Sequence, residues 1–91
     1  MYVGSLMITL YLPESRSLKD KRRIVQSILT RMRLKHRVAA SEVDDLSAWS
    51  RAVLGCACVA NTHTHAREIL EGIVRWVEQH WDVEDSRIEI L

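Results

Sequence analysis

Two cysteines and two histidines form the densest group of reactive side chains in this 91-residue sequence. Cys56-x-Cys58 is followed by His63-x-His65, and all four residues are of types that bind zinc. The spacing argues against a metal site, because residues two apart on a strand lie about 6.6 to 6.8 Å apart, too far for a tetrahedral pair of sulfurs. Histidines two apart at the start of a helix do not share a face. We therefore predict core-packed cysteines with no disulfide, no metal and no cofactor.

A second group of chemical interest is acidic. Glu42, Asp44 and Asp45 could supply a pair of carboxylates, and His65 could act as a general base. No nucleophile or oxyanion donor can be assigned beside them, and acidic turns are common next to strands. The three glycines are too scattered for a phosphate-cradling loop. We predict that the protein is not an enzyme.

The strongest signal is a local excess of positive charge. Between Pro13 and Arg37 nine Lys and Arg accompany only Glu14 and Asp20, a local excess of seven, although the whole chain carries a net charge of +1. Clustered cations create a field that favours a polyanionic partner. The predicted nucleic-acid-binding residues are Arg16, Lys19, Lys21, Arg22, Arg23, Arg31, Arg33, Lys35 and Arg37. The alternative is an ordinary solvated helix face.

RNA or the ribosome is the expected partner of this segment. The sequence has no Phe, and the apolar run from Val53 to Ala60 consists of small side chains. Strands of this kind lack the aromatic residues on which RNA-recognition motifs stack bases. We therefore expect RNA to be recognised by its shape or backbone, not by sequence-specific reading on a sheet.

The basic segment should be the outer face of a helix that follows a strand. From Tyr2 to Leu12 apolar residues alternate with others, which predicts a half-buried strand that Pro13 ends. Ser17 and Asp20 have the spacing of a capping box, so a helix should begin there and end near Leu34 or Lys35. Its apolar stripe consists of Leu18, Val25, Ile28, Leu29 and Met32.

Four further elements are predicted beyond this helix. They are a short strand over Arg37 to Val43, a central strand over Ala52 to Ala60, a helix from the Thr62 cap to about His80, and a strand over Asp82 to Leu91. The order is β-α-β-β-α-β. We predict a single α+β domain over residues 1–91, a ferredoxin-like sandwich with a four-stranded antiparallel sheet and two helices on one face.

The helix-free face of that sheet is expected to be apolar. If the helices cover Leu6, Ile8 and Leu10, strand alternation leaves another set of side chains on the opposite face. That predicted dimer or partner face consists of Met7, Tyr11, Val53, Ala57 and Val59. Exposed apolar strips often mark association, so a sheet-to-sheet homodimer is expected. The alternative is a normal scatter of exposed aliphatic residues.

Several motifs along the chain resemble a known family. They are Ser17-Leu18-Lys19 with Lys21-Arg22, Glu42-Val43-Asp44, Trp49 with Arg51-Ala52 and Leu54-Gly55, and His65-Ala66. As a set they resemble the YlxP-like (DUF503) family of small bacterial proteins of unknown function. The resemblance implies a ferredoxin-like fold and, in many genomes, a neighbourhood of translation-initiation and ribosome-maturation genes. The sequence departs from the family pattern at Asp45-Leu46-Ser47-Ala48, where more polar residues are usual.

The expected location is the cytoplasm, because the sequence shows no signal peptide, no membrane span and no secreted disulfide framework. The preferred hypothesis is a non-catalytic domain that meets RNA or the ribosome through the basic helix. The alternative hypothesis is a homo-oligomeric protein-interaction module that uses the apolar sheet face and has no nucleic-acid role.

Overall fold

The computed structural model describes residues 1–91 and contains six elements in β-α-β-β-α-β order. They are β1 (Tyr2–Tyr11), α1 (Leu18–His36), β2 (Ala39–Asp44), β3 (Arg51–Ala60), α2 (His63–Glu78) and β4 (Asp82–Ile90). The predicted α+β, ferredoxin-like arrangement is confirmed. None of the helices combines the length and apolar composition that crossing a bilayer requires.

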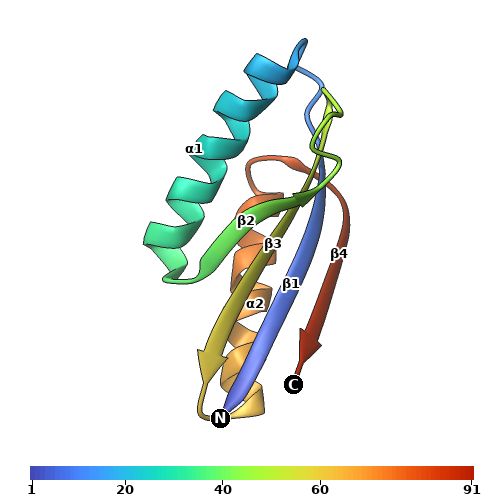
Figure 1. Ribbon diagram of the computed structural model, residues 1–91. Coiled ribbons are helices and arrows are strands. Elements are labelled where there is room, and N and C mark those ends of the chain that lie inside the picture. The colour runs from blue at the N-terminus through green and yellow to red at the C-terminus, as the bar shows by residue number, and fades with distance from the viewer.

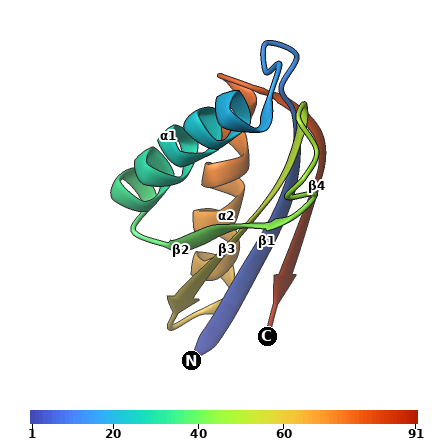
Figure 2. The ribbon, with the colours of Figure 1, turned by 45° about the horizontal axis from the view of Figure 1, so that its top comes forward.

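The four strands form one antiparallel sheet with the order β2-β3-β1-β4. Both helices lie on the same side of it, α1 beside the β2 edge and α2 across the middle (Figures 1 and 2). The contacts agree with this view, since α2 packs on β1, β3 and β4, whereas α1 contacts mainly β2. The other face of the sheet has no helix over it.

The core lies between the sheet and the two helices. Leu6 stands opposite Cys56 and Ile8 opposite Leu54, so these four side chains share the inner face of the sheet. A Cβ atom added to Gly4 would lie 2.8 Å from a methyl carbon of Leu70. The glycine on β1 therefore allows α2 to approach the sheet closely.

Both predicted helix caps are present. The Ser17 hydroxyl accepts a hydrogen bond from the Asp20 N–H at 3.0 Å, and the Thr62 hydroxyl accepts one from the His65 N–H at 3.0 Å. The Asp20 carboxylate accepts in turn from the N–H of Arg16 at 3.1 Å, one residue before the usual capping-box partner. The far end of α1 extends slightly beyond the prediction, because Arg37 adopts the left-handed conformation usually taken by glycine.

Two sequence expectations about the strands need correction. Strand β2 begins at Ala39, later than predicted, because the helix and its cap occupy the preceding residues. Val53 points to the outer side of the sheet by register but is only 7% exposed, so it is not available to a partner as predicted. Close by, the register of β2 shifts between Glu42 and Asp44, and the Val43 side chain lies over Gly55.

Candidate nucleic-acid interface

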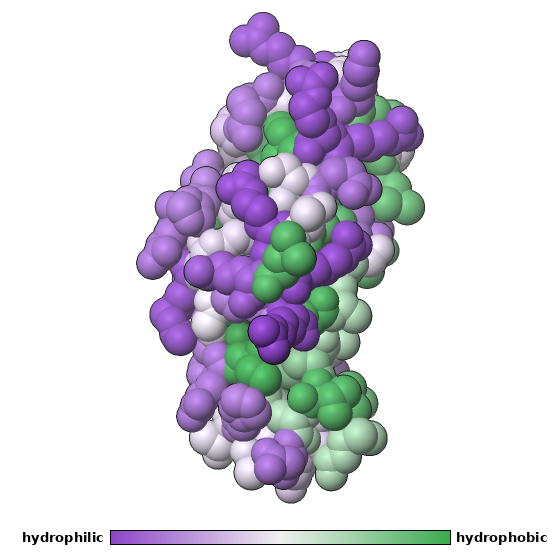
Figure 3. Space-filling model, turned by 90° about the vertical axis from the view of Figure 1, so that its left-hand side faces the viewer, coloured by the Kyte–Doolittle hydropathy of each residue, from purple (hydrophilic) through white to green (hydrophobic).

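The outward side of α1 forms most of one flank of the molecule. Val25, Ile28 and Met32 are buried against the sheet, and they fix which sides of the helix face solvent. Figure 3 looks onto the flank that carries α1, where hydrophilic side chains cover most of the surface. Hydrophobic side chains lie mainly along the right-hand side of Figure 3, with smaller groups near the middle of the face.

Seven of the nine predicted basic residues extend into solvent from α1 and the residues next to it. We call this set the basic face: Arg16, Lys19, Arg22, Arg23, Arg31, Lys35 and Arg37. The structure contains three ion pairs, Lys21–Glu42, Arg51–Glu84 and Arg67–Glu71. None involves the basic face, so its charges are not neutralised by carboxylates of this chain.

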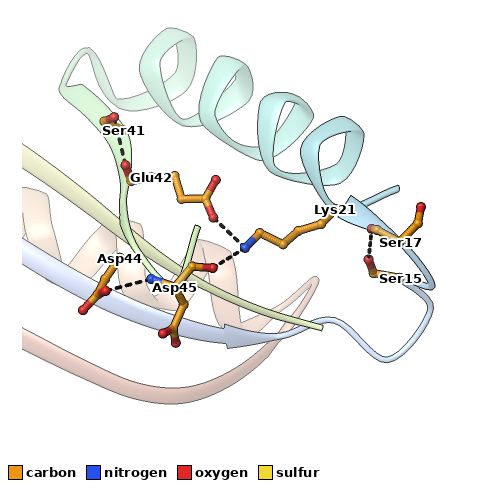
Figure 4. Close-up of polar contacts among 7 residues, drawn as sticks. All are labelled: Ser15, Ser17, Lys21, Ser41, Glu42, Asp44 and Asp45. Atoms are coloured by element: carbon orange, nitrogen blue, oxygen red, sulfur yellow. Dashed lines mark hydrogen bonds and ion pairs between the residues drawn. The ribbon is translucent and has the colours of Figure 1, made fainter. Parts of the chain in front are cut away.

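Lys21 is the first of two exceptions, and its predicted place on the exposed surface is wrong. The residue is fully buried, and its ammonium lies 2.8 Å from a carboxylate oxygen of Glu42 and donates to the carbonyl of Asp45 (Figure 4). Strand alternation explains the pairing, because Glu42 stands opposite the core residue Leu54 and therefore faces the helix layer. Lys21 ties α1 to β2 and is not available to a phosphate.

Arg33 is exposed but already engaged. Its guanidinium donates to the carbonyl of Ala40 through Nε at 3.2 Å and Nη2 at 2.6 Å. The side chain thus links the last turn of α1 to the backbone of β2. We therefore place Arg33 at the margin of the interface and not within the basic face.

Sequence reasoning did not identify a cleft beside the basic face. It has a volume of about 350 Å³ and is lined by Glu14, Arg23, Ile24, Ser27, Arg31 and Trp81. The guanidinium of Arg31 donates to the Ser27 hydroxyl at 2.8 Å and lies 5.4 Å from the centre of the Trp81 ring. The i, i+4, i+8 spacing of Arg23, Ser27 and Arg31 is the signal that could have shown their shared side.

The position of the basic face along α1 is electrostatically unfavourable at one end. Lys19 lies in the first turn, where the helix macrodipole disfavours positive charge, and Arg22 and Arg23 follow closely. Lys35 and Arg37 lie at the other end, where positive charges interact favourably with the helix dipole. Helix stability therefore accounts for the cations at the C-terminal end but not for those at the N-terminal end.

The cysteines and histidines do not come together. Cys56 and Cys58 are free and face the core, whereas His63 and His65 are exposed at the start of α2. Burial, with the neighbouring Cys58, raises the pKa of the Cys56 thiol to about 12. A protonated thiol is neither a nucleophile nor a good metal ligand at neutral pH. Nowhere do three His, Cys, Asp or Glu side chains cluster as a metal site requires.

The three carboxylates considered for catalysis have local structural contacts. Glu42 pairs with Lys21, and Asp44 accepts a hydrogen bond from the N–H of Asp45 at 2.8 Å. Asp45 has a positive φ of 54°, and its carbonyl accepts from Lys21. These contacts shape the turn after β2 and leave no paired acid and base.

The helix-free face of the sheet contains an apolar hollow of about 500 Å³. Its lining includes Met7, Val43, Gly55 and Ala57. Of the other residues predicted on this face, Tyr11 and Val59 are exposed. The charged residues Asp85, Arg87 and Glu89 of β4 stand opposite outward-facing positions of β1, so the apolar surface is confined to the β1, β2 and β3 side.

Comparisons with known proteins agree with this fold. "Uncharacterized protein YlxP" of Bacillus subtilis (strain 168) is 29% identical over 68 residues, which cover 75% of this chain and 74% of that protein. The structure of "De novo designed protein Ferredog-Diesel" is similar in fold, with a TM-score of 0.52 and 20% identity over 96% of this chain and 83% of the other. The family model described as "Protein of unknown function (DUF503)" matches residues 3–90. This chain therefore belongs to the DUF503 family.

Proposed function

We propose that this protein binds RNA, with ribosomal RNA as the natural candidate, through the basic face of α1 and without catalysis. The observation that supports the proposal is the set of exposed Lys and Arg side chains that have no carboxylate partner in the chain. Such a set neutralises phosphates and releases their counterions. The unfavourable cations at the start of α1 add support, because helix stability alone does not favour them.

The dimensions of the basic face suit a folded RNA. A helix of 19 residues is roughly 28 Å long, and cations occur near both of its ends. Several phosphates along an RNA backbone can therefore be contacted at once. The helix-free face of the sheet presents no row of aromatic side chains for stacking, so recognition rests on shape and backbone.

Salt dependence is the direct test of this proposal. A structured RNA titrated with the protein should bind with an affinity that falls steeply as salt rises. Replacing Lys19, Arg22 and Arg23 together with Gln should weaken binding and lower the slope of log affinity against log salt by about two to three. Lys21 stays unchanged in this variant, because its removal would affect folding.

A matched control removes the same charge elsewhere. Changing Arg67, Arg75 and Arg87 to Gln also takes away three cations, but from α2 and β4. This control should keep both the affinity and the slope close to those of the wild type. Equal losses in the two variants would show only a net-charge effect, and absence of binding at low salt would refute the proposal.

Self-association is a second candidate function, favoured by the apolar hollow on the sheet. Met7, Val43 and Val59 are 45%, 50% and 64% exposed around or beside it. We propose a second copy of this chain as the occupant, because alternating charges on β4 would border the same apolar strip in both copies of a two-fold pair. Burial of these side chains would stabilise the dimer.

Sedimentation over a range of concentrations tests this candidate. The wild type should pass from monomer to dimer as concentration rises, and Val59→Lys should shift that transition to higher concentration. Thr64→Lys, on α2, is the control and should leave the transition unchanged. A wild-type protein that stays monomeric at high concentration would exclude the dimer and leave RNA binding unaffected.

A further inference from the structure

We propose that the cleft between α1 and Trp81 binds one unpaired nucleotide of a single-stranded RNA, with its phosphate between Arg23 and Arg31 and its base stacked at Trp81. This inference rests on the proposed RNA binding and extends it. With such a site, the basic face would prefer RNA that contains an unpaired segment. The six lining residues belong to α1, the loop before it and the turn between α2 and β4, so the cleft is formed only in the folded chain.

The phosphate position follows from the geometry of α1. Arg23 and Arg31 are two turns apart, roughly 12 Å along the helix axis, and Ser27 lies midway between them on the same side. Two long guanidinium side chains can reach a group held above that midpoint. Arg31 already bends toward it, because its Nη2 donates to the Ser27 hydroxyl at 2.8 Å. Arginine forks and a hydroxyl are well suited to phosphate oxygens.

The base position follows from the pairing of Arg31 with Trp81. The guanidinium carbon lies 5.4 Å from the centre of the Trp81 ring, and Trp81 is itself braced by Trp76 and His80, with ring centres 5.5 Å away in each case. Unpaired RNA bases stack on aromatic rings and on guanidinium planes. The Arg31 guanidinium and the Trp81 ring, fixed next to each other, provide flat surfaces on which a base can stack. Its neighbour Ile24 adds an apolar wall.

The charge of the surroundings determines the direction in which the nucleotide lies. A second cleft of about 300 Å³ shares Glu14 and Trp81 with the first, but it adds the carboxylates of Glu78 and Asp82 and has no Lys or Arg in its lining. A phosphate is therefore favoured in the cleft that contains Arg23 and Arg31 and disfavoured in the one that contains three carboxylates. The cleft volume of about 350 Å³ is at the small end of ligand sites, which suits a single nucleotide.

The main test compares single-stranded with paired RNA. The full chain is titrated with a short oligoadenosine and with a fully paired duplex, in wild-type and Arg31→Lys forms. Lysine keeps the charge but loses the planar fork, so affinity for the single strand should fall by roughly fivefold or more, and affinity for the duplex, which depends on the retained charge, should fall much less. Arg75→Lys, on the exposed side of α2 and outside both the cleft and the basic face, is the matched control and should leave both affinities unchanged.

A second variant removes the ring itself. Trp81→Leu should lower affinity for oligoadenosine by roughly tenfold or more, again without affecting duplex binding. Because Trp81 packs partly on the core, thermal unfolding is followed alongside. Chemical shifts provide an independent readout: adenosine monophosphate should move the Trp81 indole N–H and the Ser27 amide further than inorganic phosphate does.

The outcomes separate this inference from the function on which it rests. If Arg31→Lys and Trp81→Leu bind oligoadenosine as the wild type does, while RNA binding itself persists, the nucleotide site is refuted and the proposed function stands. If inorganic phosphate reproduces every shift caused by the nucleotide, base stacking is refuted. If neither RNA binds, both proposals fail.

Discussion

The two helices lie on the same face of the sheet but differ in almost every other respect. The exposed side of α2 mixes Arg67 and Arg75 with three glutamates, and one arginine pairs with Glu71. The exposed side of α1 carries an unpaired excess of cations. Toward the core, α2 buries only apolar residues, whereas α1 buries Lys21 among its aliphatic side chains.

This difference distinguishes what packing of the fold requires from what it leaves unexplained. Helix α2 packs on β1, β3 and β4 and has the mixed surface of an ordinary helix, so it shows what the fold alone requires. Helix α1 packs mainly on the edge strand β2 and retains charges that its own dipole disfavours. The excess on α1 is therefore not explained by folding, and the following substitutions test that conclusion.

The largest effect is expected at Lys21. Lys21→Ala leaves the carboxylate of Glu42 without its partner and should lower the free energy of unfolding by about 3 kcal/mol, measured by denaturant unfolding. Arg22→Ala, at the neighbouring exposed position, should change it by less than about 0.5 kcal/mol. Lys21→Met combined with Glu42→Leu should recover most of the loss. Equal losses at positions 21 and 22 would contradict the distinction between inner and outer cations.

A smaller effect is expected where α2 meets the sheet. An Ala side chain at Gly4 would lie 2.8 Å from Leu70, 3.1 Å from the Cys58 sulfur and 3.2 Å from Ile90. Gly4→Ala should therefore lower stability by about 1 to 3 kcal/mol through overpacking. Gly72→Ala, inside α2 with its nearest neighbour 3.7 Å away, is the control and should raise stability by about 0.5 to 1 kcal/mol. If thermal melts showed no loss of stability for Gly4→Ala, α2 would be able to move away from the sheet without a free-energy cost.

Opposite effects are expected at the two ends of α1. Lys19→Glu places an anion near the positive end of the helix dipole and should stabilise the fold by about 0.3 to 1 kcal/mol, while Lys35→Glu should destabilise it by a similar amount. Both should weaken RNA binding. A gain in stability together with a loss of binding would show that Lys19 serves binding at a cost to the helix. If Lys19→Glu left RNA affinity unchanged, the basic face would begin further along α1.

The contact between the helices should give a small pH dependence. Burial, and then the charge of Lys35, lowers the pKa of His36, whose ring centre lies 5.5 Å from that of Trp76. Below a pH of about 6.5 the unfolded chain binds a proton that the folded state resists, so this residue's contribution makes stability fall with decreasing pH. Melting temperatures between pH 7.5 and pH 5 should decline less in His36→Gln than in the wild type. Parallel curves would contradict this role.

Much of the fold was predictable because the signals are local. Alternation in β1, the Ser17 and Thr62 caps, and the helical periodicity of α2 each depend on neighbours in sequence. The same periodicity places Lys21 on the apolar stripe of α1, three residues after Leu18 and four before Val25. A lysine is seldom fully buried without a partner, and the partner of Lys21, Glu42, is distant in sequence, so the sequence alone does not reveal its burial.

The features that were missed depend on tertiary contacts. The side of the sheet to which Val53 points follows from strand parity, but its burial does not, because the neighbouring strand β2 has a shifted register. The cleft beside the basic face requires Trp81, in the turn between α2 and β4, to come next to Arg31 on α1. Spacing alone gives the arginines and the serine a common side; only the packed chain brings an aromatic ring to it.

The hydrogen bonds from Arg33 to the Ala40 carbonyl also affect whether copies of this protein can associate through the edge of the sheet. They hold a permanent positive charge against the border strand of an open sheet, where a foreign strand would otherwise be able to add. A strand from another chain would have to desolvate or displace that guanidinium. The side chain that links α1 to β2 thus also disfavours the addition of a further strand at this edge of the sheet.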